Sequence, residues 1–110
     1  MNGNNTPFLA GTLELIVLQL LEGEPTNGYD LTLRIQAISR DVLKVNAGSL
    51  YPALYRLEQR GLLKPSWVKS ETGRRTKSYT VTAAGRKQLE AQRADWKRFS
   101  GALAAILQTG

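Results

Sequence analysis

Residues 46–62 read NAGSLYPALYRLEQRGL, and this stretch decides the fold. The asparagine at its start can cap a helix through its side-chain oxygen, and Gly61 near its end is the residue type that closes one. The leucines recur at four- and three-residue intervals and so line one face of that helix: Leu50, Leu54 and Leu57. Pro52 lacks an amide hydrogen, so the helix must bend there or begin later than Asn46.

The residues that follow change from a helical to a strand period. Residues 62–68 and 77–82 are typical of two strands, and Gly73 lies between them where a hairpin turn requires a positive φ. Thr82 can then cap a last helix that begins at residue 83 or 84 and extends to about residue 108. This part of the chain therefore predicts a β-hairpin followed by a long helix.

Two further helices are expected before residue 46. In residues 7–23 the apolar positions recur at three- and four-residue steps, until Gly-Glu-Pro at 23–25 stops the helix. Turn residues at 26–28 then lead into a short second helix that ends near Ser39. The connector at 40–45 is apolar enough to pack against the domain.

Three helices, a two-stranded hairpin and a final helix follow one another in the order of a winged helix-turn-helix, which is mainly α with a small β-hairpin. In this fold the third helix enters the major groove of DNA and the hairpin flanks it. We divide the chain into a flexible N-terminus (1–6), a DNA-binding domain (7–82) and a C-terminal dimerisation helix (83–110).

The last helix carries apolar residues on a heptad repeat, the pattern of a helix–helix seam. Seven residues separate neighbours in each row, which are Leu89, Trp96 and Leu103 in one and Phe99 and Ile106 in the other. A helix of about 25 residues is about 37 Å long, more than a domain of this size covers. We therefore expect a homodimer through this helix. The alternative is a helix that lies across its own core.

Positive charge is concentrated in the second half of the chain. Residues 1–46 contain three basic and five acidic residues, whereas residues 47–110 contain twelve basic and four acidic ones. Five of these bases fall close together in and around the hairpin turn: Lys64, Lys69, Arg74, Arg75 and Lys77. A concentrated basic segment is typical of a surface that meets nucleic-acid phosphate, so double-stranded DNA is the expected partner.

The composition excludes most catalytic and metal chemistry. The chain contains no cysteine and no histidine, which removes disulfides, thiolate catalysis, Cys/His zinc sites and histidine bases. The acidic residues are scattered, so we expect no enzyme activity, no metal and no cofactor. The apolar stretch from Leu13 to Leu21 is too short for a membrane span, and the start lacks a signal-peptide pattern. We expect a cytoplasmic protein with no membrane association.

Short motifs from Leu9 to Leu107 resemble one family, the PadR-like transcriptional regulators. They are GTLE at 11–14, NGY at 27–29, GSLYPAL at 48–54, LE at 57–58 with GL at 61–62, GRR at 73–75 with Lys77 and Tyr79, and TAAG at 82–85. The resemblance implies a bacterial, nucleoid-associated homodimeric repressor of the compact form, with its dimer contact on the first and last helices. It also accounts for Pro52. The chain departs from the family at Asn27, often histidine, and at Ser78, where a second tyrosine is common.

Twelve residues are expected to contact DNA. Small residues in the first turn of the third helix permit close approach, long side chains on its exposed face reach bases or backbone, and basic side chains at the hairpin tip suit phosphate or the minor groove. In that order they are Ala47, Gly48 and Ser49; Tyr51, Tyr55 and Arg56; and Arg74, Arg75 and Lys77. The resemblance adds Asn27, Tyr29 and Tyr79. The alternatives are a simple helix start, a core tyrosine and a solvated charged turn.

Trp96 is the expected regulatory residue. At a seam position of the last helix, its indole can stack against its mate across a two-fold axis. Regulators that resemble this chain hold flat aromatic or cationic ligands between such rings, which implies a small aromatic effector with Phe8, Phe99 and Leu103 around it. The alternative is a packed interface aromatic.

A second class of function uses the same fold differently. The winged helix can act as the scaffold of a protein–protein adaptor, whose basic hairpin meets an acidic partner. The salt dependence of DNA binding separates the two classes, because each lost phosphate contact lowers the log–log slope by about 0.9.

Overall fold

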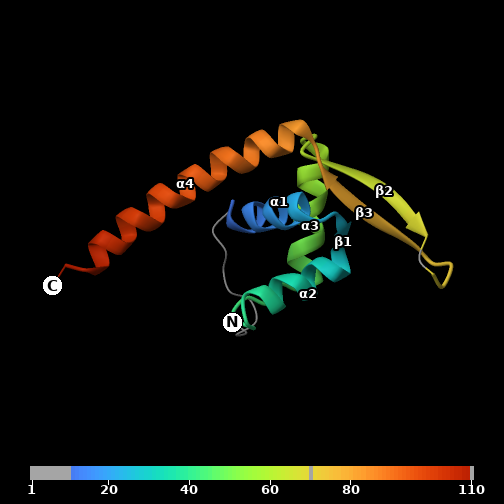
Figure 1. Cartoon of the computed structure of the whole chain (residues 1–110), viewed down its shortest axis with the longest axis horizontal. Coiled ribbons are helices and arrows are strands. Elements are labelled where there is room, and N and C mark those ends of the chain that lie inside the picture. Colours follow the sequence, from blue (N-terminus) through green and yellow to red (C-terminus); the bar gives the residue numbers. More distant parts are fainter. Residues whose placement is uncertain (1–10, 70, 110) are drawn as a thin grey trace.

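The computed structural model describes residues 11–69 and 71–109, so the predicted N-terminus, the start of the first helix and Phe8 lie outside the described residues. The elements are α1 (Thr12–Gly23), β1 (Thr26–Asn27), α2 (Gly28–Ile38), α3 (Ala47–Gln59), β2 (Leu63–Lys69), β3 (Arg75–Val81) and α4 (Ala83–Leu107). The first three helices cluster at the centre, the hairpin projects to one side and α4 extends to the other (Figure 1). The molecule is elongated, 59 × 33 × 21 Å, and the predicted winged-helix order is confirmed.

The core is built from leucines of the three central helices, as their spacing predicts. The largest fully buried side chains are Val17, Leu18, Leu21, Leu31, Leu50, Leu54 and Leu57. The base of the hairpin closes this core with Leu63, Tyr79 and Val81. Burial of one such leucine contributes about 1.5–3 kcal/mol, so these helices supply much of the stability of the domain.

Side-chain caps fix where the helices begin. The Asn46 side chain accepts a hydrogen bond from the Ser49 amide at 3.0 Å, and the Thr82 hydroxyl accepts one from the Gly85 amide at 3.0 Å. Both caps were predicted and are confirmed. The alternative that α3 begins later than Asn46 is wrong, because the helix contains Pro52 in its interior. Pro52 lies on the exposed side, where water can reach the carbonyl that a proline cannot bond.

The sheet has three antiparallel strands in the order β1-β3-β2. β2 pairs with β3 along seven residues, from Leu63 opposite Val81 to Lys69 opposite Arg75. β1 was not predicted, since residues 26–28 read as a turn; it pairs Thr26 with Tyr79 on the other edge of β3. A two-residue strand has no period of its own, so only its distant partner reveals it. This strand ties the start of α2 to the base of the hairpin.

The junction between the hairpin and α4 is tightly packed. The Thr82 amide donates to the Leu62 carbonyl at 3.1 Å, and the Thr82 hydroxyl donates to the Gly61 carbonyl at 2.7 Å. A Cβ on Gly85 would lie 2.2 Å from the Leu62 carbonyl oxygen, so only glycine allows this approach. Gly61 itself has a φ of +76°, which explains its place after α3.

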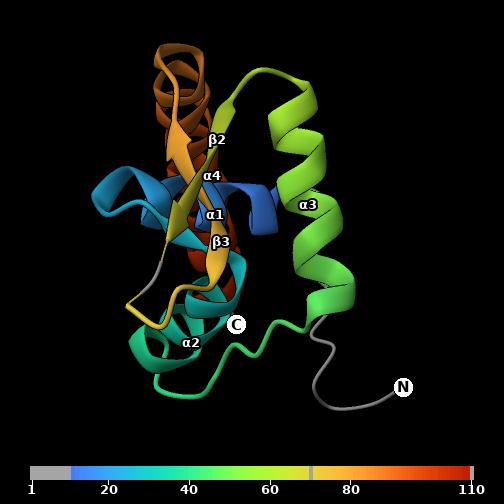
Figure 2. The same cartoon turned by 90° about the vertical axis from the view of Figure 1, so that its right-hand side faces the viewer.

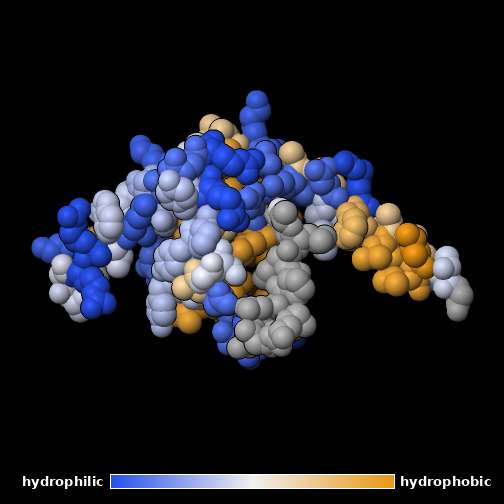
Figure 3. Space-filling view, turned by 180° about the vertical axis from the view of Figure 1, so that it is seen from behind, coloured by the Kyte–Doolittle hydropathy of each residue, from blue (hydrophilic) through white to orange (hydrophobic). Residues whose placement is uncertain are grey.

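α4 is covered by its own domain only near its start. Leu89 is 4% exposed and belongs to the core, whereas the apolar side chains beyond it are exposed, so the helix does not lie across its own core. Figure 3 shows these side chains as a hydrophobic patch toward the C-terminal end of α4. In residues 11–69 and 71–109, no helix combines the length and apolarity that a bilayer span requires.

Candidate nucleic-acid interface

The start of α3 presents an exposed, small-residue surface. Ala47, Gly48 and Ser49 occupy its first turn, and all three are exposed. The first amides of a helix have no carbonyl partner within it, and together with the helix dipole they attract anions. The Asn46 side chain satisfies only the Ser49 amide among these three residues. The predicted candidates of this turn are therefore placed where a phosphate can approach them.

Tyrosines from two helices gather around a hollow between α3 and the wing, by which we mean the β2–β3 hairpin. The hollow has a volume of about 490 Å³. Its lining comes from α2, α3, β1 and β3: Asn27, Gly28, Tyr29, Tyr51, Tyr55, Glu58, Thr76, Lys77 and Tyr79. Figure 2, in which the wing faces the viewer, shows α3 beside it and α2 below. Six of the twelve predicted contacts thus come together here from segments far apart in sequence.

Gly28 explains how α2 and α3 approach one another in this hollow. A Cβ at this position would lie 2.7–2.9 Å from the ring end of Tyr51. The Tyr51 ring therefore rests against the first turn of α2, while about half of the residue stays exposed. Tyr29 and Tyr55 are more exposed still, so the hollow offers three aromatic side chains to a partner.

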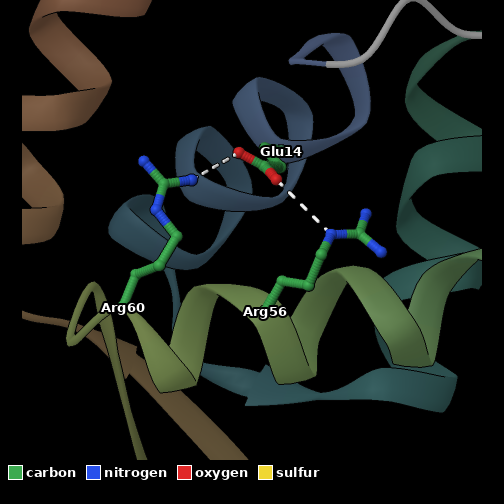
Figure 4. A network of polar contacts seen from close by, with 3 residues as sticks. All are labelled: Glu14, Arg56 and Arg60. Carbon is green, nitrogen blue, oxygen red and sulfur yellow. Dashed lines mark hydrogen bonds and ion pairs between the residues drawn. The ribbon is translucent and has the colours of Figure 1, made fainter.

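Arg56 lies apart from the hollow and is engaged with α1. Its Nε lies 3.7 Å from Oε2 of Glu14, while Nη1 of Arg60 donates to Oε1 of the same carboxylate at 3.0 Å (Figure 4). One carboxylate on α1 thus holds two arginines of α3. This contact joins the two helices and leaves Arg56 less suited to DNA than its exposure in sequence suggested.

Lys77 is held at the edge of the hollow by α3. Its Nζ lies 3.1 Å from Oε1 of Glu58 and 5.4 Å from the centre of the Tyr79 ring. The hydrogen bond to the Glu58 carboxylate raises the pKa of Lys77 above its ordinary value. Lys77 is therefore fully charged at neutral pH, but its charge is largely compensated within the chain.

Tyr79 is placed differently from the prediction of a DNA-contacting ring. It is 6% exposed and closes the core at the base of the wing. Its ring forms the floor beneath the Lys77 ammonium. The structure thus favours the structural alternative for this tyrosine, because the strand that carries it is the central one of the sheet.

The tip of the wing carries arginines whose charge is not compensated. Gly73 has a φ of +85°, as the predicted turn requires. Among residues 11–69 and 71–109, neither Arg74 nor Arg75 forms a salt bridge. The Arg75 guanidinium lies over the Trp67 ring, 5.4 Å from its centre. The tip is accordingly the most electropositive part of the interface.

The exposed patch of α4 provides the predicted dimer residues, except Leu89. Trp96 and Phe99 lie side by side with ring centres 5.9 Å apart, and Leu103 and Ile106 continue the same row toward the C-terminus. Trp96 also borders an apolar hollow of about 370 Å³ formed mainly by α1 and α2. No group of three or more His, Cys, Asp or Glu side chains within the described ranges could hold a metal ion.

A family model for the transcriptional regulator PadR-like family matches residues 17–91. The chain belongs to this family. Transcriptional regulator Rv3488 of Mycobacterium tuberculosis is 36% identical over 86 residues, which cover 78% of this chain and 77% of that protein. A PadR-like transcriptional regulator from Bacillus cereus of known structure is 29% identical, with a TM-score of 0.80 over 93% of this chain and 97% of that one.

A further relative differs in length from this PadR-like chain. An uncharacterized 37.1 kDa protein in a Streptomyces fradiae transposon is 35% identical over 88 residues. The match covers 80% of this chain but only 24% of that protein. The PadR-like domain is therefore found within a larger polypeptide in that relative.

Sequence reasoning missed three residues that organise the interface of this PadR-like protein. Glu14 and Glu58 decide which cations are paired, and Trp67 lies beneath Arg75. Glu14 and Arg60 are 46 residues apart, so no local spacing signals their contact. Once the hairpin register is known, Trp67 opposite Lys77 becomes the signal for an aromatic–cation cluster.

Proposed function

We propose that this protein is a homodimeric repressor of the PadR-like family that binds a palindromic operator. α3 enters the major groove with its first turn and its exposed tyrosines, and the wing contacts the flanking backbone or minor groove. As a repressor of chromosomal genes it acts in the cytoplasm at the nucleoid, without catalysis or a cofactor.

The observation that carries this proposal is the hollow between α3 and the wing. The start of α3 offers amides and small side chains, and the hollow beside it is lined by Tyr51 and Tyr55 of the same helix. The wing adds Arg74 and Arg75, which form no salt bridge within the described ranges. Donors for phosphate, aromatic side chains for bases or sugars and free positive charge thus surround one surface.

Dimerisation through α4 is part of the same proposal. Trp96, Phe99, Leu103 and Ile106 are exposed on a helix that extends beyond its own domain. Pairing two such patches removes the apolar surface from water and gives the protein a two-fold axis. A symmetric winged-helix dimer then reads two half-sites about 34 Å apart, which is why the operator is palindromic.

An aromatic effector is the proposed release signal. The apolar hollow beside Trp96 is lined by Leu15, Ile16 and Ile38 among others, and is large enough for a flat ring system. A ligand that stacks on Trp96 at the dimer interface changes the spacing of the two α3 helices and so weakens operator binding. Titration of Trp96 fluorescence with planar cationic dyes, compared with a Trp96→Phe variant, tests this step.

Fluorescence anisotropy with a labelled duplex from upstream of the protein's own gene tests the core of the proposal. At about 0.15 M salt we expect binding that survives at least a ~10³-fold excess of random-sequence competitor. Binding that the competitor removes, on this and on duplexes selected from a random library, would favour the adaptor alternative. Light scattering of the same sample is expected to give the mass of a dimer.

A further inference from the structure

Trp67 is a large aromatic residue that the core does not use. It lies in the outer half of β2 and is 60% exposed. It faces Lys77 directly across the hairpin, and Arg75 is its diagonal neighbour on β3. Residues that are opposite one another in an antiparallel pair share one face of the sheet, and diagonal neighbours are within reach of long side chains. Trp67 and the two cations therefore lie on one face of the wing.

This face is continuous with the proposed DNA-binding surface. Lys77 on the same face reaches Glu58 of α3, and Tyr79, two residues further along β3, lines the hollow. The opposite face of the wing carries Ser66, Val68 and Ser78, which are not basic. The wing thus presents its positive charge, together with Trp67, on the side of α3.

The contact between Trp67 and Arg75 leaves the arginine able to bind a phosphate. The guanidinium lies over the indole, so the contact uses its flat face, and the N–H donors in its plane stay available. The arginines at Glu14 show the other arrangement, in which the same donors are consumed by a carboxylate. An aromatic floor thus orders an arginine without neutralising it.

We propose that Trp67 is a positioning residue for DNA binding, which holds the Arg75 guanidinium ready for a backbone phosphate. The inference rests on the proposed function of the wing. Arginine loses much rotamer freedom when it binds, and ordering it beforehand reduces that loss on association. Trp67 therefore acts through Arg75, and its removal matters only when Arg75 is present.

A double-mutant cycle measures this dependence by anisotropy on the operator duplex. Trp67→Ala is expected to weaken binding about threefold for each subunit, and so about tenfold for a dimer on two half-sites. Trp67→Phe keeps an aromatic floor and recovers most of the affinity. In an Arg75→Ala background, Trp67→Ala causes no further loss. Val68→Ala, one residue along on the other face of β2, is the matched control and binds as the wild type does.

A measurement on the free protein separates this inference from the proposed function. Stacking on an indole shifts the side-chain proton resonances of Arg75 upfield in NMR spectra, and Trp67→Ala abolishes the shift. If the shift is present but Trp67→Ala binds the operator as tightly as the wild type, or adds its full effect to Arg75→Ala, the positioning role is refuted while the wing remains a DNA contact. If the wild type lacks competitor-resistant binding, the proposed function and this inference fail together.

Discussion

The α3 surface and the wing tip both carry two arginines, but they keep them in opposite states. On α3, Arg56 and Arg60 share the carboxylate of Glu14 and join that helix to α1. On the wing, Arg75 rests on an aromatic ring and forms no salt bridge within the described ranges. The difference shows that the number of basic residues does not locate a phosphate-binding surface. What each cation already contacts decides whether it is available.

The junction that supports the wing offers the largest expected effect. Gly85→Ala places a methyl group against the Leu62 backbone carbonyl, where nothing flexible can move aside. We expect the free energy of unfolding to fall by about 3 kcal/mol, measured by urea denaturation. Gly101→Ala on the same helix has open space around it and is expected to stabilise by about 0.5–1 kcal/mol. Equal effects of the two variants would contradict the packed junction.

Tyr51 can be displaced without touching a charge. Gly28→Ala pushes a methyl group into the Tyr51 ring, whose far end can move. We expect operator binding to weaken about tenfold, equivalent to about 1.4 kcal/mol, with the salt slope unchanged. Gly23→Ala has nothing near its added methyl group and is the control. Wild-type affinity in Gly28→Ala would mean that the placement of Tyr51 is not used by DNA.

Glu14→Gln tests whether the α3 arginines are structural. The variant removes the shared partner of Arg56 and Arg60 and is expected to lower the free energy of unfolding by about 1 kcal/mol. Operator binding keeps its salt slope, because these side chains are directed at α1 and not at the hollow. Glu22→Gln, an exposed acid on the same helix, removes the same charge as a control. A steeper slope in Glu14→Gln alone would show that the arginines had been released to DNA.

The Lys77–Glu58 pair gives the smallest effect and one that depends on pH. Because the pKa of Lys77 is raised in the folded protein, its contribution to stability is complete below the pKa of the unfolded chain and is lost as the pH rises through the folded pKa. We expect the stability difference between the wild type and Glu58→Gln to be constant from about pH 7 to 9 and to shrink toward about pH 11. Urea denaturation across this range measures it; a difference that grows with pH would contradict the pair.

Local patterns predicted the helices, their caps and the hairpin turn because those features depend on nearby residues. Asn46, Gly73 and Thr82 announce their roles through side-chain chemistry or backbone freedom, and the structure agrees. β1 was missed because two residues have no period, and only pairing with Tyr79 makes them a strand. Leu89 fits the heptad but belongs to the core, since the repeat does not say where the domain ends.

The candidate site was predicted in composition but not in electrostatics. Six of its residues line one hollow, as the winged-helix order implied. The state of each cation depends on contacts between distant segments, such as Glu14 with Arg60 and Glu58 with Lys77. These contacts require the packed structure, which is why Arg56 was grouped with the free cations of the wing.

The salt dependence of operator binding in two double variants tests the central claim most directly. Arg74→Ala/Arg75→Ala and Arg56→Ala/Arg60→Ala remove the same charge from the two regions compared above. We expect the log–log slope to fall by about 1.8 for the wing variant, about 0.9 for each lost phosphate contact, and to stay at the wild-type value for the α3 variant. A fall for the α3 variant, with the wing variant unchanged, would contradict the claim that cations left unpaired within the chain are those that bind DNA.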